Sequence, residues 1–200
     1  MAATATPYGL RAVNHIGGTP YAGSTRMFPI ASGYAANLYN GSIVSVIADG
    51  TIVFTAAVGT AAAAFQAGTV GIFVGCTFTD PNSGNVTFRQ NWPTGTVAAD
   101  AQAYVVDDPA AVFQVQANGS MAAATLGSCC SIIAQTSTTG NTTSGNSTTA
   151  VNSATVSVNQ DAFKIIGFAD APQSTVGDAF TDILVKFNPT QHAYTSGTGI

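Results

Sequence analysis

The stretch "VGIFVGCTFTDPNSGNVTFRQNWP", residues 70–93, decides the fold that the sequence predicts. Two apolar runs flank "TDPNSGN", whose Pro, Asn, Ser and Gly are typical loop residues. The stretch is therefore predicted to form a β-hairpin. The only Trp of the chain, Trp92, comes near its far end. The hairpin is either the wall of an active site or a surface for another protein.

The same pattern recurs along the chain. Residues 42–56, "SIVSVIADGTIVFTA", hold two runs rich in Val and Ile around Asp49-Gly50, a pair that favours a type I′ turn. Only one short helix is predicted, over about 120–127, with Ser120 as its cap and Gly127 at its end. These patterns predict an all-β domain, a single barrel or sandwich of short strands. The further strands are predicted at 101–108, 111–117, 131–135, 155–159, 162–168 and 182–188.

The chain divides into two predicted parts. Residues 1–41 contain many Pro and Gly residues but also apolar anchors. They are therefore predicted to form an extended N-terminal arm that packs on another protein surface. Residues 42–200 are predicted to form one β domain. Within it, residues 136–149 contain only Thr, Ser, Gly and Asn, which predicts an exposed, mobile loop.

Charged residues are scarce. Lys and Arg together number 5 and the acids number 9, all of them Asp, so that only 7% of the chain is charged, against about a quarter in an ordinary soluble domain. With a net charge of −4 the chain lacks the basic stripe that phosphate binding requires, so nucleic acid is not an expected partner. No signal peptide and no continuous apolar block long enough to span a membrane is apparent. Few like charges would oppose close packing against other chains.

Two groups of residues were candidates for chemistry. Asp107-Asp108 would suit a metal or catalytic site, but neighbours in an extended segment face opposite ways, so a strand end and turn is the favoured interpretation. Cys76 could act as a nucleophile with His15 or His192 and perhaps Asp80. Nothing around Cys76 lowers a thiol pKa, and no phosphate-binding loop, dinucleotide fingerprint or CxxC motif occurs. An enzyme, a metal site and a cofactor are therefore not predicted, and the adjacent Cys129 and Cys130 are expected to be reduced.

Seven residues are candidates for contacts with another protein. The aromatic anchors of the arm could fill grooves on a partner, and Trp92 is predicted at a contact edge, although such aromatics more often pack in a core. Arg11 and Arg26 are each predicted to pair with an Asp or a backbone carbonyl, in the domain or on a neighbouring chain; the alternative is an exposed arginine without a partner. The candidates are Tyr8, Arg11, Tyr21, Arg26, Phe28, Tyr34 and Trp92.

Three stretches resemble a family of tailed-bacteriophage structural proteins of marine and freshwater phages, including cyanophages, described as head decoration, cement or capsid-stabilising proteins. They are "PYGLRAVNHIGGTPYAGSTRMFPIASGYAANLYNGSIV", "VGIFVGCTFTDPNSGNVTFRQNWPTGTVAADAQAYVVDDPAAVFQVQANG" and "LVKFNPTQHAYTSGTGI". The most specific part runs from Gly75-Cys76 through Asp80-Pro81 and Trp92-Pro93 to Asp107-Asp108-Pro109. Residues 136–158 match only loosely.

The resemblance implies a protein that is assembled in the host cytoplasm and binds the outer surface of the virion head. There it would clamp adjacent subunits of the major capsid protein, as a homotrimer or, as the second choice, a dimer. It implies no catalytic residues. The apolar anchors of residues 1–41 suggest a working hypothesis, in which the arm carries much of the capsid contact. Deleting residues 1–41 should then abolish attachment and leave the β domain folded. The alternatives are another virion component, such as a fibre or capsid-associated protein, and a carbohydrate-binding β module with "TDPNSGN" at its site.

Overall fold

The computed structural model describes residues 4–169, 174–197 and 199. Short strands dominate this part of the chain, and three single-turn 3-10 helices join them. The strands are β1 (Arg11–His15), β2 (Arg26–Pro29), β3 (Leu38–Tyr39), β4 (Ser42–Val46), β5 (Ile52–Phe54), β6 (Thr69–Thr79), β7 (Val86–Arg89), β8 (Asn91–Trp92), β9 (Gln102–Val106), β10 (Ala111–Gln116), β11 (Cys129–Cys130), β12 (Phe163–Phe168) and β13 (Asp182–Phe187). The 3-10 helices are η1 (Ala123–Thr125), η2 (Ser153–Thr155) and η3 (Pro189–Gln191).

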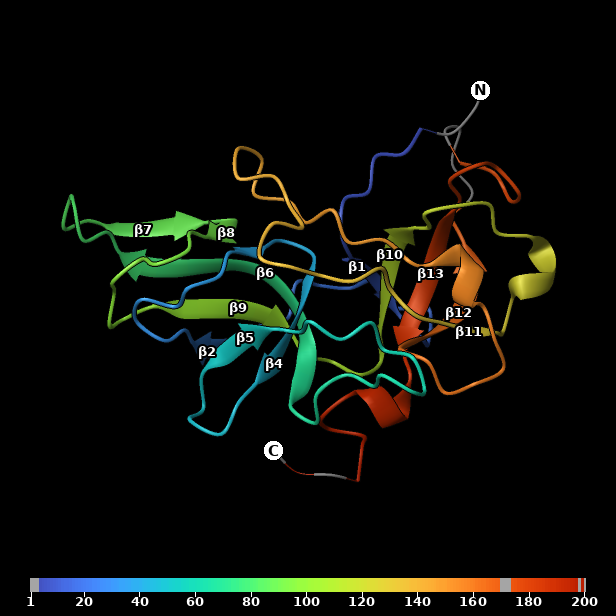
Figure 1. Cartoon of the computed structure of the whole chain (residues 1–200), viewed down its shortest axis with the longest axis horizontal. Coiled ribbons are helices and arrows are strands. Elements are labelled where there is room, and N and C mark those ends of the chain that lie inside the picture. Colours follow the sequence, from blue (N-terminus) through green and yellow to red (C-terminus); the bar gives the residue numbers. More distant parts are fainter. Residues whose placement is uncertain (1–3, 170–173, 198, 200) are drawn as a thin grey trace.

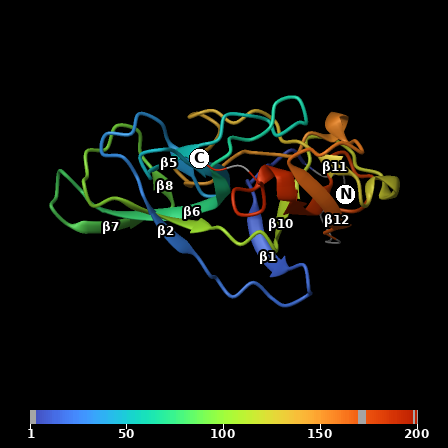
Figure 2. The same ribbon diagram turned by 90° about the horizontal axis from the view of Figure 1, so that it is seen from below.

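The strands form two main antiparallel sheets that lie side by side along the molecule (Figures 1 and 2). The five-stranded sheet has the order β1-β10-β13-β12-β11. The six-stranded sheet has the order β2-β9-β6-β4-β5, and β7 pairs with β6 beside that path. A small third sheet joins β3 to β8. The all-β prediction is confirmed, but the sheets are open at their edges and no closed barrel forms.

Strand β6 organises the six-stranded sheet. One of its edges pairs with β9, while the other pairs with β4 along its first half and with β7 along its second half. The register shifts on both sides near Gly71 and Gly75. A Cβ atom on Gly71 would collide with the carbonyl oxygen of Val106. Glycine is therefore required for the close approach of β9 at this irregular point of the strand.

Two apolar cores pack against the sheets, and the six-stranded sheet contributes to both, since Ile43 and Ile72 belong to the core of the five-stranded sheet. The core of the five-stranded sheet centres on Phe163 and Phe187, whose ring centroids are 4.6 Å apart, and includes Phe113. The core of the six-stranded sheet is built around Phe73 and Trp92, both fully buried. Strands β4, β6 and β10 are buried along most of their length. In β6 the two-residue repeat turns Ile72 toward one core and Phe73 toward the other.

Both predicted hairpins are present. The hairpin of residues 70–93 consists of β6 and β7, and its loop is closed by the Asp80 N–H donating to Asn85 O at 2.9 Å. In the β4–β5 hairpin the prediction of a type I′ turn was wrong, because among the described residues only glycines have positive φ, and Asp49 therefore does not. Gly50 alone takes the left-handed conformation, with φ of 80°. The Asp49 carboxylate instead accepts the N–H and hydroxyl of Thr51 at 2.9 and 2.7 Å.

The predicted arm of residues 1–41 is part of the sheets. It supplies β1 to one edge of the five-stranded sheet, β2 to one edge of the six-stranded sheet, and β3 to the small sheet. It also supplies core residues, namely Leu10, Ile30, Leu38 and Tyr39. The structure therefore shows no separation between an arm and a β domain at residue 41. The Pro and Gly residues mark the connections between these strands.

The helix predicted at about 120–127 was wrong in extent, because only the single 3-10 turn η1 forms there. The Ser120 hydroxyl donates to Gly177 O at 2.8 Å, and the Met121 N–H donates to Thr181 Oγ1 at 3.1 Å. These bonds tie the start of the predicted helix to the 175–181 segment, and η1 begins after Ala122 without a side-chain cap. Gly127, with φ of 82°, does lie in the left-handed conformation after the turn.

Residues 136–149 are only partly exposed, which corrects the prediction of an exposed loop. The tip at 141–144 is exposed, but Ser147 and Thr149 are fully buried. Their hydroxyls lie 2.8 Å apart, and Thr149 Oγ1 donates to Gln135 Oε1 at 3.0 Å. Polar side chains can be buried where they are paired in this way. The returning half of the loop therefore packs onto the body of the protein.

Candidate functional site

The connection between β9 and β10 carries the densest group of charges in the described residues. Asp107 Oδ2 lies 3.0 Å from Arg26 Nε of β2, and it accepts the Tyr194 hydroxyl at 2.9 Å. Arg26 Nη1 in turn donates to the Tyr194 oxygen at 3.0 Å. Burial and the neighbouring Asp107 carboxylate raise the pKa of Tyr194 to about 12. Strand β9 ends at Val106, two residues before the end of the predicted strand 101–108, and the two aspartates lie in the turn that the sequence favoured for them.

Asp108 faces a different partner. Its Oδ2 lies 3.2 Å from Nδ1 of His15 at the end of β1, and its Oδ1 accepts the Ala110 N–H at 2.7 Å. The two carboxylates therefore hold the edge strands of different sheets, β2 by Asp107 and β1 by Asp108. This division explains why they do not converge on a common ion. No group of three or more His, Cys, Asp or Glu side chains in the described part of the chain could hold a metal.

Four of the predicted contact residues already have partners within the chain. The Arg26 side chain pairs with Asp107, so one of the two alternatives for this arginine, an ion pair within the domain, is realised. Tyr21 donates its hydroxyl to Ser24 O and places its ring 5.9 Å from that of His15. The hydroxyl of Tyr34 accepts the Phe54 N–H at 3.1 Å. Phe28, half-buried on β2, packs against the core of the six-stranded sheet.

Tyr8 and Arg11 form a separate pair beside β10 and β13. The Arg11 guanidinium lies 4.6 Å from the centroid of the Tyr8 ring, the geometry of a cation–π contact. Burial raises the pKa of Tyr8, and the Asp182 carboxylate acts in the same direction. Arg11 itself is exposed. The pair is thus a surface feature of the five-stranded sheet.

The prediction that Trp92 lies at a contact edge was wrong. Its side chain is 0% exposed, and its ring packs edge-on against Phe78 with centroids 5.2 Å apart. Its indole N–H points to Tyr34 O at 3.5 Å. Strand β8 pairs with β3 and so turns Trp92 into the core. A partner protein cannot reach Trp92 unless this part of the six-stranded sheet unfolds.

The geometry around Cys76 does not suit a nucleophile. Its side chain is fully buried, and this burial raises the pKa of the thiol to about 12. The thiol donates to Asn91 O at 3.6 Å, and neither histidine accepts from it. Because the reactive form of cysteine is the thiolate, Cys76 is inert at neutral pH. The other two cysteines are also free thiols, and burial raises the pKa of Cys130.

His192 gives the structure a specific pH dependence. It is buried next to Phe187, its Nδ1 accepts the Tyr194 N–H at 3.2 Å, and burial lowers its pKa despite the opposing effect of Asp107 and Asp108. As the pH falls below about 6.5, the unfolded chain takes up this proton first. The free energy of unfolding should therefore fall with pH until the folded pKa is passed.

Urea denaturation at pH 7.5 and 5.5 tests this prediction. The wild type should lose more stability between the two pH values than a His192→Gln variant, by at most about 1.4 kcal/mol. Gln is chosen because it is polar and does not titrate. Equal losses in the two proteins would contradict the assignment.

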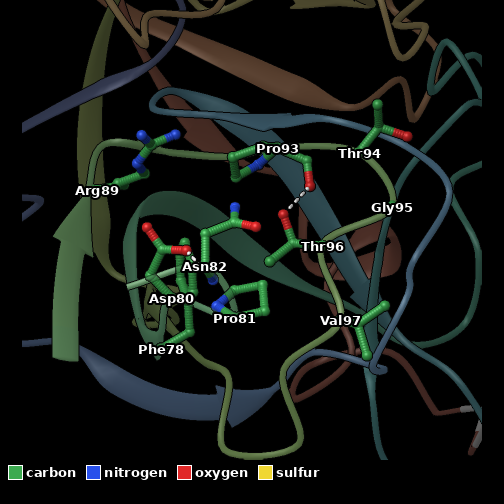
Figure 3. Close-up of a pocket in the computed structure, with 10 residues that line it drawn as sticks. All are labelled: Phe78, Asp80, Pro81, Asn82, Arg89, Pro93, Thr94, Gly95, Thr96 and Val97. Carbon is green, nitrogen blue, oxygen red and sulfur yellow. Dashed lines mark hydrogen bonds between the residues drawn. The ribbon is translucent and has the colours of Figure 1, made fainter. Parts of the chain in front are cut away.

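A hollow of about 410 Å³ lies at the tip of the β6–β7 hairpin, and Figure 3 shows the residues that line it. The loop residues Asp80 and Asn82 line one side, and Arg89 and the 93–97 segment line the rest. Asp80 Oδ1 accepts the Asn82 N–H at 2.8 Å. Phe78, the aromatic residue of this hollow, is buried, so no ring face is offered for stacking on a sugar. The hollow is the space between the hairpin loop and the 93–97 segment, and its lining does not indicate a sugar site.

Sequence reasoning missed the most apolar exposed surface of the six-stranded sheet. The register places Met27, Gly75 and Tyr104 side by side on the outer face, and the Phe88 ring lies over Gly75 with its centroid 5.8 Å from that of Tyr104. Met27, Val86 and Phe88 are 58%, 77% and 63% exposed. We call Met27, Val86, Phe88 and Tyr104 the apolar sheet face. Gly75 was a usable signal, since it leaves room for the Phe88 ring.

Comparisons with known proteins give no neighbour for this arrangement. No protein-family model, curated protein or solved structure matches the chain. None of the helices in the described residues is long and apolar enough to cross a membrane.

Proposed function

We propose that this chain is a virion structural protein that decorates the outer surface of a phage head. It binds adjacent subunits of the major capsid protein there and stabilises the DNA-filled shell. The chain acts without a cofactor, catalytic turnover, nucleic acid or membrane, and it works as a homo-oligomer. The resemblance of the sequence to phage decoration proteins motivates the proposal.

The observation that carries the proposal is the apolar sheet face. Single exposed apolar residues are ordinary on protein surfaces, but a contiguous group on one sheet face is typical of an interaction site. Three of its four side chains are more than half exposed. Burying one such side chain against a partner contributes about 1.5–3 kcal/mol. Several copies that engage the lattice together would add their contacts through effective concentration.

The charge distribution supports the same role. Arg26, the neighbour of Met27 on β2, pairs with Asp107 and, because side chains alternate along a strand, points to the opposite face of the sheet, on the side of Val105. A shell protein that covers this face therefore does not have to remove the Arg26 and Asp107 charges from water, which would cost free energy. The same ion pair holds β2 at the edge of the sheet, which keeps Met27 in register with Tyr104.

Attachment of a Met27→Asp variant to undecorated heads tests the proposal. A carboxylate at this position would be buried without a partner in the complex, so head affinity should fall at least about tenfold, the equivalent of 1.4 kcal/mol. Val158→Asp is the matched control, because Val158 is 96% exposed and lies outside the six-stranded sheet. Both variants should unfold at the wild-type denaturant concentration. Full attachment of Met27→Asp would refute the role of this face, and failure of the wild type to bind heads would refute the function.

A further inference from the structure

Strand β7 presents an open edge of the six-stranded sheet. It pairs with β6 on one side, and on the other side no hydrogen bond engages its backbone among the described residues. Figure 1 shows β7 along the outer margin of the sheet, and Figure 2 shows the same margin free from a second direction. Val86 and Phe88 are strongly exposed on it. An open edge of this kind is a template for another strand.

The other edge strands are covered or interrupted. Residues Pro20 and Tyr21 fold back along β1, where the Tyr21 N–H donates to Val13 O at 3.2 Å. The Tyr34 hydroxyl accepts the Phe54 N–H of β5, and Ser157 bridges to Cys129 of β11. Strand β2 ends in Pro29, which cannot donate to a ladder. At β7, residues 142–145 line a hollow together with Arg89 at one end of the strand, but among the described residues no backbone hydrogen bond joins them to the strand.

We propose that β7 pairs with β7 of a second copy of this chain, antiparallel about a two-fold axis. A two-fold register centred on any residue of β7 conserves the faces, because directly opposed residues share a face. The register proposed here is centred on Thr87, so that Thr87 lies opposite Thr87 of the second copy and Val86 lies opposite Phe88. Val86 and Phe88 of both copies then form one continuous apolar strip. The two six-stranded sheets join into a single sheet.

Charge complementarity selects this antiparallel arrangement. Arg89 ends β7 and has no acidic partner within 4.0 Å in the described structure, while Asp80 precedes the loop that leads into β7. The proposed register sets Arg89 opposite Asn85 of the second copy, and Asp80 lies across from that Asn85 on β6. The backbones of Arg89 and of Asp80 in the second copy are then roughly 10 Å apart, two strand spacings. Extended arginine and aspartate side chains span this gap, and the two-fold axis makes the pair twice.

This dimer rests on the proposed function, in which the chain works as a homo-oligomer, and gives that oligomer a specific interface that forms without a head. It also places the apolar sheet faces of two copies next to each other, which doubles the surface offered to a shell protein. Met27 lies on β2, at the far side of the sheet from β7. A Met27→Asp variant should therefore dimerise normally even though it fails to attach, so the two ideas can fail independently.

Sedimentation of the full chain, with and without charge exchange, tests the dimer. The wild type should sediment at twice the mass of the 20.1 kDa chain. Asp80→Arg and Arg89→Asp should each raise the dissociation constant at least threefold, and the double exchange should restore it. Rescue by the double variant separates an ion pair between copies from damage to the loop. A wild-type monomer or trimer at 100 μM would overturn the proposal, as would failure of the double variant to recover.

A disulfide cross-link tests the register. Opposed residues of an antiparallel pair have Cα atoms about 4.5–5.5 Å apart, within the range that a disulfide bridges. Thr87→Cys should give a covalent dimer when oxidised glutathione accepts the electrons of the two thiols. Val97→Cys is the control, since Val97 is exposed near the hairpin but does not lie on β7. Equal cross-linking of the two variants would refute the assigned edge.

Discussion

A chain that begins at residue 42 is expected to lose its cooperative fold. The deletion removes β1 and β2 from the two main sheets and takes β3 away from β8. It also removes four large buried side chains, besides the buried Ala36, and each large one contributes about 1.5–3 kcal/mol through burial. Their sum is comparable with the whole stability of a domain, about 5–15 kcal/mol. The truncated chain should show no sigmoidal thermal transition by circular dichroism and a poorly dispersed NMR spectrum.

The matched control changes the same segment without removing its core. Ile16 is 54% exposed in the turn after β1, so Ile16→Ser should alter the free energy of unfolding by no more than about 0.5 kcal/mol. If the chain of residues 42–200 melts cooperatively near the temperature of the full chain, the arm is an appendage after all. The hypothesis that residues 1–41 carry much of the head contact would then regain its basis.

The strands that the sequence predicted share a strong local signal. In β4, β6, β10 and β13, runs of Val, Ile and Phe bounded by turn residues predict extended structure without tertiary information. Strand β2 has no such signal, because "RMFP" combines one apolar pair with a charge and a proline. Its place is decided by β9, whose open edge it covers. Sheet order is a property of the whole chain, so the arm could not be assigned to a sheet from its own residues.

The prediction of an exposed loop at residues 136–149 was wrong because it rested on composition alone. A segment of hydroxyl and amide side chains has little apolar surface to bury, which predicts exposure. The structure instead uses Gln135, whose side chain accepts the Ile43 N–H at 3.0 Å and donates to Thr55 O at 2.9 Å. Thr149 completes the network by donating to the same amide. Such a network depends on pairings between residues up to 92 positions apart, which no local window contains.

The candidate site was predicted in part. Pairing of an arm arginine with an aspartate was among the alternatives for Arg26, and the separation of Asp107 from Asp108 followed from strand geometry. The apolar sheet face was not predicted, since Phe88 and Met27 resemble core residues until the register decides which face they occupy. The same uncertainty led to the wrong placement of Trp92. A two-residue repeat gives the two faces of a strand but not which of them is covered.

Replacing Trp92 by alanine should destabilise the protein by about 3–5 kcal/mol, the usual cost of deleting a buried aromatic side chain. The loss comprises the packing against Phe78 and the cavity left between β8 and β6. Phe88→Ala is the matched control, because Phe88 is an aromatic residue of the same hairpin that is 63% exposed, and its loss should cost under about 1 kcal/mol. Denaturant titrations of the three proteins by circular dichroism give both values. If the two substitutions cost the same, Trp92 does not anchor this core.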